Sequence, residues 1–133
     1  MRVIRNYLLV IARLLMSSLF LWEGSVQLRN SKGAVQYFAN VHVPMPETAI
    51  WLSVIIHIAG GLAILIGLKT RWAAGLLALL CLGTAFGVHL PVGDASNMLN
   101  FYKNLVMTGG FLYVITFGAG PISLDGNGAA SAL

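Results

Sequence analysis

Seven polar side chains interrupt long apolar stretches of the sequence and are the candidates for chemistry: Arg13, Glu23, Gln27, His57, His89, Lys103 and Asn104. An ionisable residue within such a stretch is costly in a membrane, so it usually faces other protein segments and has a partner. Carboxylate, imidazole, ammonium and amide groups can together bind a small molecule through hydrogen bonds or transfer a proton. These seven residues are therefore candidates to line a small-molecule or proton-handling pocket.

The spacing of these residues places most of them at a similar depth. A rise of about 1.5 Å per residue, counted from the middle of each apolar run, puts Glu23 about 9 Å from the membrane centre, with Gln27 one turn further out on the same face. His89, Lys103 and Asn104 come out at about 9 to 12 Å on the same side. We therefore expect side chains from three helices to meet in one polar cluster in the outer half of the membrane.

Arg13 and His57 lie closer to the middle of their apolar runs. His57 is close to the membrane centre and Arg13 is about 6 Å toward the opposite side, so the two could approach each other across the first two helices. Two interpretations of the polar residues remain open: they line a pocket, or they form buried pairs that fix the register of the helices. For His57, a hydrogen-bonded core histidine is favoured over a metal ligand.

Other chemistries are not supported by the sequence. His57 and His89 differ in depth by about 12 Å, which excludes a haem held by both. Cys81 is the single cysteine, so the sequence offers no cysteine-based metal site, and we expect no metal. No nucleophile elbow, P-loop, dinucleotide fingerprint or H-E-x-x-H motif appears, and no residue is assigned a catalytic role.

The composition is that of an integral membrane protein. The 133 residues are 58% apolar and only 9% charged, with a mean hydropathy of +0.84, whereas a soluble domain needs far more charged side chains to cover its surface. The eight basic residues are spread along the chain, so no basic patch for nucleic acid is expected. We expect one membrane domain over residues 1–125 and a weakly ordered tail over residues 126–133.

Four apolar runs are long enough to cross a bilayer as helices and far too long for barrel strands: residues 7–28, 47–68, 72–90 and 101–119. Residues 33–43 are too short to span and predict an interfacial helix that Pro44 and Pro46 end. The predicted fold is an all-α, four-transmembrane-helix bundle with a short interfacial helix between helices 1 and 2.

The basic residues predict the orientation of this bundle. Four spans place both termini on one side together with the turn between the second and third spans. That side carries Arg2, Arg5, Lys69 and Arg71, whereas the other carries Arg29 and Lys32, with Lys103 at the mouth of the last span. Because cytoplasmic segments are enriched in Lys and Arg, both termini are predicted to be cytoplasmic.

Several short motifs, in this order, resemble the DoxX family: Phe20-Leu21-Trp22-Glu23-Gly24, Tyr37-Phe38-Ala39, Gly60-Gly61, Gly67-Leu68-Lys69-Thr70-Arg71, Asn100-Phe101-Tyr102-Lys103-Asn104 and Gly120-Pro121-Ile122-Ser123-Leu124-Asp125. The resemblance covers roughly residues 10–125. The family consists of small bacterial and archaeal four-helix inner-membrane proteins, and its namesake belongs to a thiosulfate:quinone oxidoreductase. His57 departs from the family, which commonly has a carboxylate before the Gly-Gly pair.

The resemblance implies an inner-membrane protein that is at most a membrane subunit of a quinone-linked oxidoreductase or oxidative-stress assembly. Quinone is the implied ligand, without a covalently bound cofactor, and the implied partners are the lipid bilayer, other membrane or redox proteins, or a second copy of the chain. A noncatalytic assembly protein, with purely structural polar residues, remains the alternative. A small-solute carrier ranks lowest, because the four helices lack a repeated half.

Overall fold

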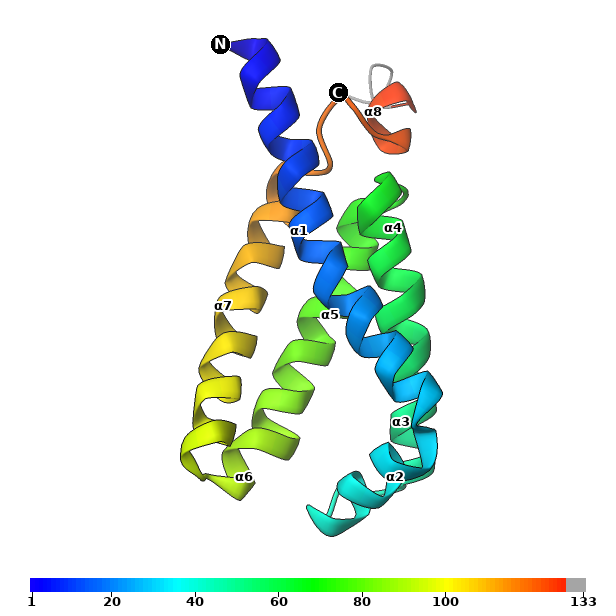
Figure 1. Cartoon of the computed structure of the whole chain (residues 1–133). Coiled ribbons are helices and arrows are strands. Elements are labelled where there is room, and N and C mark those ends of the chain that lie inside the picture. The colour runs from blue at the N-terminus through cyan, green and yellow to red at the C-terminus, as the bar shows by residue number, and fades with distance from the viewer. Residues whose placement is uncertain (129–133) are drawn as a thin grey trace.

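The computed structural model describes residues 1–128, and its regular elements are all helices (Figure 1). They are α1 (Arg2–Arg29), α2 (Ser31–Asn40), α3 (Pro46–Ile55), the π-helix η1 (Ile56–Gly60), α4 (Gly61–Ile66), α5 (Thr70–Thr84), the π-helix η2 (Ala85–His89), α6 (Leu90–Val92), α7 (Ala95–Phe117) and α8 (Leu124–Gly128). Because α3, η1 and α4 are continuous, as are α5, η2 and α6, the bundle has four long helical segments.

These segments confirm the predicted four-helix membrane bundle. Three of them, Arg2–Arg29, Pro46–Ile66 and Thr70–Val92, are long and apolar enough to cross a membrane by length and composition. The fourth, α7, is 23 residues long and carries polar residues in its first half. The short helix α2 lies between the first two segments, as predicted.

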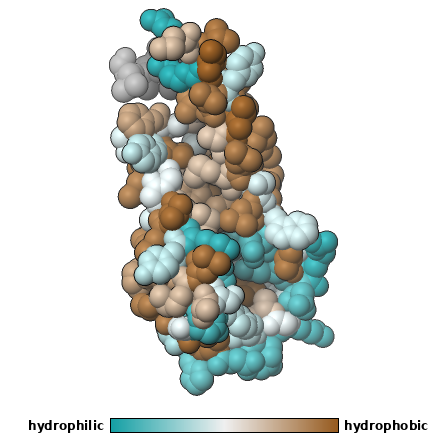
Figure 2. Space-filling view, turned by 60° about the vertical axis from the view of Figure 1, so that its left-hand side comes forward, coloured by the Kyte–Doolittle hydropathy of each residue, from teal (hydrophilic) through white to brown (hydrophobic). Residues whose placement is uncertain are grey.

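The outer surface is apolar, as lipid requires. Large apolar side chains such as Leu15, Trp72, Leu79 and Val106 are between 67% and 79% exposed. Figure 2 shows hydrophobic side chains over the middle of the visible face and hydrophilic ones gathered toward its lower end. That end carries α2 and the turn between α6 and α7, whereas the N-terminus and α8 lie at the other end (Figure 1).

The helix boundaries differ from the predicted spans mainly at α7, which begins six residues before the expected residue 101. Asp94 explains the early start, because its carboxylate accepts the backbone N–H of Asn97 at 2.8 Å and caps the first turn. Polar residues just before residue 101 are therefore helical rather than part of a loop. Residues 126–128, expected in the tail, end α8, and residues 129–133 lie outside the described part of the chain.

The four segments pack as two pairs. The first segment, α1, packs along α3, η1 and α4, while α7 packs along α5 and η2. Phe20, Leu77 and Phe111 join the pairs in one core. Gly24 brings α1 close to η1, since a Cβ at this position would lie 2.8 Å from Cγ1 of Ile58 and 2.9 Å from Cβ of His57.

A second set of contacts holds the C-terminal segment against the helices. The buried Arg13 guanidinium donates to the carbonyl oxygens of Leu65, at 3.4 Å, and Ile122. Both carboxylate oxygens of Asp125 accept backbone N–H groups at 2.7 Å, from Lys69 and Thr70 at the start of α5. The C-terminal segment is thus fixed to α1 and to the start of α5 by charge-assisted hydrogen bonds.

These hydrogen bonds lower the pKa of Asp125. Burial by itself raises the pKa of Asp125, but the hydrogen bonds from Thr70 and Lys69 and the positive charge of Arg13 outweigh this effect. The net pKa lies below the ordinary value of 3.8. The ionised carboxylate therefore stabilises the folded protein at neutral pH, and this contribution is lost as the pH falls through the lowered pKa.

Gly24→Ala is expected to lower the free energy of unfolding by about 1 to 3 kcal/mol, because the added methyl group overpacks the contact between α1 and η1. Gly75→Ala is the matched control, since a Cβ there has nothing within 4 Å and alanine favours the helix. Thermal unfolding in mild detergent measures both variants. Equal stability of the two would contradict the close approach of α1 to η1.

Asp125→Asn is expected to destabilise the protein by about 1 kcal/mol at neutral pH, because the amide has a single acceptor oxygen and leaves one of the two backbone N–H groups unpaired. The difference from the wild type should shrink as acid protonates Asp125 in the wild-type protein. Hydrogen exchange of the Lys69 and Thr70 amides measures the local effect. Asp94→Asn, which alters the cap of α7 at the other end, should leave these two amides unchanged.

Candidate functional site

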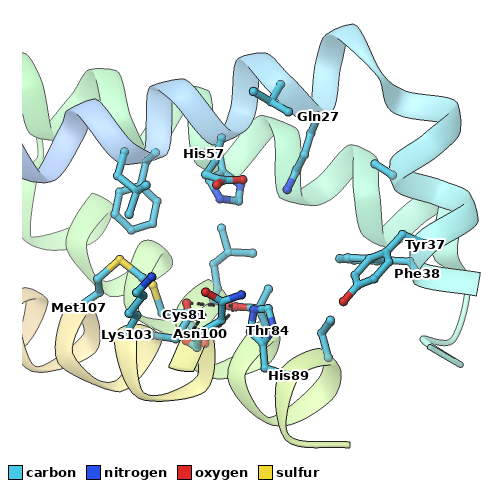
Figure 3. A pocket seen from close by; sticks show the side chains of 18 of the residues that line it. Gln27, Tyr37, Phe38, His57, Cys81, Thr84, His89, Asn100, Lys103 and Met107 are labelled. Atoms are coloured by element: carbon cyan, nitrogen blue, oxygen red, sulfur yellow. Dashed lines mark hydrogen bonds between the residues drawn. The ribbon is translucent and has the colours of Figure 1, made fainter. Parts of the chain in front are cut away.

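A cavity of about 1000 Å³ separates the two helix pairs in the half of the bundle that carries α2. Six of the seven residues selected from the sequence line it: Glu23, Gln27, His57, His89, Lys103 and Asn104. In Figure 3, Gln27 and His57 lie on one side, and Thr84, His89, Asn100 and Lys103 lie across from them. The depth estimate grouped Glu23, Gln27, His89, Lys103 and Asn104, and the structure adds His57, which was expected to approach Arg13 instead.

Arg13 is the seventh candidate, and the structure places it elsewhere. Its side chain binds Leu65 and Ile122 near the termini rather than approaching His57. Gly67, with a φ of 71°, allows this position, because a Cβ there would collide with the Arg13 guanidinium. Arg13 therefore contributes to the attachment of the C-terminal segment and does not line the cavity.

His57 lies on the wall formed by α1, α3 and η1 and is 7% exposed. Its Nδ1 is 2.8 Å from the Ser53 carbonyl oxygen and 3.1 Å from the Ser53 hydroxyl. That hydroxyl donates to Oε1 of Gln27 at 2.9 Å. Because α1 and α3 are joined through this chain of hydrogen bonds, the imidazole has a fixed orientation.

Asn104 and Lys103 lie on the opposite wall. Asn104 is buried, donates to the Asn100 carbonyl at 2.9 Å and accepts from the Thr84 hydroxyl at 3.3 Å. Lys103 is the next residue on α7 and lines the same cavity. Thus α7 presents an amide that is held in place and an ammonium group with a long, adaptable side chain.

His89 lies at the end of η2 and lines the cavity. Its Nδ1 is 2.8 Å from Oδ1 of Asn97, and the Tyr37 hydroxyl of α2 donates to the same oxygen at 3.4 Å. The Asn97 side-chain NH2 donates to Asp94 at 3.0 Å, which fixes the orientation of the amide. These contacts link the short helix α2 to the start of α7 beside the cavity.

Both cavity histidines lie in π-helical segments, His57 in Ile56–Gly60 and His89 in Ala85–His89. Single π-helical turns inside α-helices are rare and frequently occur at functional sites. The apolar runs of the sequence predict helices but do not distinguish one type of helical turn from another. Tyr37 and Asn97 were missed for a related reason, since their contacts cross between elements. Ser53 precedes His57 by four residues, so the helical period already places the two on one face.

The cavity also has apolar walls that face the side of the bundle. Leu19 and Val26 of α1 and Leu99 and Val106 of α7 line it and are between 39% and 75% exposed. Since these side chains are exposed on two helices that belong to different pairs, the cavity opens sideways between α1 and α7. An amphipathic molecule dissolved in the bilayer could therefore enter it without leaving the membrane.

Comparison with known proteins agrees with the fold. The DoxX family model matches residues 8–90. The chain is 38% identical over 126 residues to inner membrane protein YphA of Escherichia coli, covering 91% of this chain and 90% of the relative. It is 37% identical over 116 residues to inner membrane protein YqjF of the same organism, covering 87% and 88%. No solved structure matches it. Together, the four-helix fold and these matches show that the chain belongs to the DoxX family and is a multi-pass inner membrane protein.

Proposed function

We propose that the cavity binds the ring of an isoprenoid quinone and that the protein is a small membrane subunit of a quinone-linked redox or oxidative-stress assembly. One observation carries this proposal: a cavity with polar groups inside opens sideways through apolar side chains of α1 and α7. A quinone has the matching chemistry, since its ring has two carbonyl oxygens and its tail is apolar.

The size and polarity of the cavity support this assignment. Its volume of about 1000 Å³ is at the upper end of the range for small-molecule sites. The Lys103 ammonium can only donate hydrogen bonds, so it suits a quinone carbonyl. Phe20 and Met107 line the same cavity and offer apolar surface to the faces of a ring.

The redox reaction itself would need a partner. The side chains around the cavity can bind and orient a ring, and they can exchange protons, but electrons must come from or go to another redox centre. A membrane or peripheral redox protein is therefore the partner that this function requires. The inner membrane also holds the quinone pool that such a partner would use.

A noncatalytic assembly protein is the alternative, and one observation favours it. The hydrogen bonds from Ser53 to Gln27 and between Ser53 and His57 connect α1 with α3, as expected of polar residues that fix helix register. In that case the cavity would hold lipid. Substitutions on its α7 wall would then leave the affinity for quinone unchanged. Quinone binding separates the two functions.

Lys103→Met is expected to weaken the binding of decylubiquinone about tenfold or more, because it removes a charged hydrogen-bond donor. Isothermal titration calorimetry of the purified protein in mild detergent gives the dissociation constant. Lys69→Met is the matched control, because Lys69 lies at the other end of the bundle and only its backbone contacts Asp125. Its affinity should equal that of the wild type.

A double variant, Glu23→Leu with Lys103→Met, distinguishes a binding role from a structural one. Both side chains are exposed within the cavity region, so we expect the double variant to unfold at the wild-type temperature while its quinone affinity falls. Loss of folding would indicate a structural role for the two residues. Wild-type affinity in the folded double variant would contradict the proposed site.

The orientation of the bundle is tested separately. Arg2, Arg5, Lys69 and Arg71 lie on the side of the termini, and we expect this side to be cytoplasmic. A reporter enzyme that is active only in the periplasm, fused after Leu133, should therefore be inactive, while a cytoplasmic reporter at the same site should be active. The reverse pattern would place α2 on the cytoplasmic side.

A further inference from the structure

The hydrogen bonds of His57 determine which ring nitrogen carries its proton. A carbonyl oxygen can only accept, so the 2.8 Å contact with the Ser53 carbonyl requires a proton on Nδ1. The Ser53 hydroxyl gives its own proton to Gln27, so it too accepts from Nδ1. The neutral ring therefore has an unprotonated Nε2, which is a hydrogen-bond acceptor.

The same reasoning applies to His89. Asn97 directs its NH2 group toward the Asp94 carboxylate, which can only accept, so its Oδ1 faces His89. The 2.8 Å contact with this oxygen places the His89 proton on Nδ1. Both histidines of the cavity thus use Nδ1 to donate to the protein and keep Nε2 as an acceptor.

Nε2 is then the nitrogen that each ring has left for a ligand, and both rings line the cavity. The two Nε2 atoms come from opposite helix pairs, and the Glu23 carboxylate, which lines the same cavity, is also an acceptor. A quinone carbonyl placed against such a group would find no donor and would lose its hydrogen bonds to water. A hydroxyl group of a quinol would donate to it.

We propose that this cavity prefers the reduced, hydroxyl-bearing form of the ligand, the quinol, over the quinone. The inference rests on the proposed function and specifies the redox form that the site holds. A site built to accept from a hydroxyl discriminates strongly against an analogue that lacks it, because its buried polar group is left unpaired. Lys103, a donor that lines the same cavity, serves either form, since a quinol oxygen can also accept.

The first test compares decylubiquinol, kept reduced under anaerobic conditions, with decylubiquinone by isothermal titration in mild detergent. We expect the wild-type protein to bind the quinol about tenfold more tightly. A tenfold preference raises the two-electron midpoint potential of the bound couple by about 30 mV, which redox titration measures independently.

His57→Phe and His89→Phe keep a ring without its nitrogens, and each should reduce the preference.

His42→Asn is the control for the loss of a histidine. His42 lies outside the cavity, and its φ of 64° is one that asparagine tolerates. This variant should keep the wild-type preference for the quinol. It also removes the third histidine signal from spectra of the protein.

The second test observes the tautomers directly and does not depend on the folding of any cavity variant. Nitrogen-15 NMR of histidine-labelled protein should show an unprotonated Nε2 and a protonated Nδ1 for both His57 and His89. A protonated Nε2 on these rings would overturn the inference. Equal affinity for the two redox forms, or tighter binding of the quinone, would overturn it while leaving the proposed function intact. Absence of binding by either form would overturn the proposed function itself.

Discussion

A buried polar group in this protein must find its partner within the bundle, because the bilayer core supplies no water. This constraint explains most side-chain contacts of the transmembrane segments. The hydroxyls of Ser18, Thr108 and Thr116 donate to carbonyl oxygens three or four residues earlier on their own helices. Arg13 cannot be satisfied so locally, and its guanidinium reaches the carbonyls of Leu65 and Ile122.

The two ends of the bundle meet this constraint in different ways. At the end that carries the termini, the C-terminal segment closes the gap between the helix pairs, and Asp125 caps α5. At the other end, the cavity separates the pairs, and α2 contacts α7 through Tyr37 and Asn97. One end is therefore rigidly tied, and the other can admit a molecule from the lipid side. This asymmetry is the structural basis for the proposed quinone site.

The position of His57 shows how a family fold can carry different chemistry. The resemblance implies a carboxylate at this place in many DoxX proteins, and a carboxylate and a neutral imidazole with its proton on Nδ1 both accept hydrogen bonds. Gly24 brings α1 against this residue, so its backbone position is fixed by packing and its ring by Ser53. The proposed preference for a hydroxyl-bearing ligand thus depends on one backbone carbonyl rather than on the residue type alone.

The sequence by itself determined the membrane class, the four helices and the short helix α2, since apolar run length is a local property of the chain. Helical rise grouped Glu23, Gln27, His89, Lys103 and Asn104, which share a cavity with His57. Only the tertiary structure decided that Arg13 binds the C-terminal segment, that two π-helical turns carry the histidines and that Asn97 of α7 orients His89. These features depend on which helix faces which, and helix rotation and long-range hydrogen bonds leave no periodic pattern in the sequence.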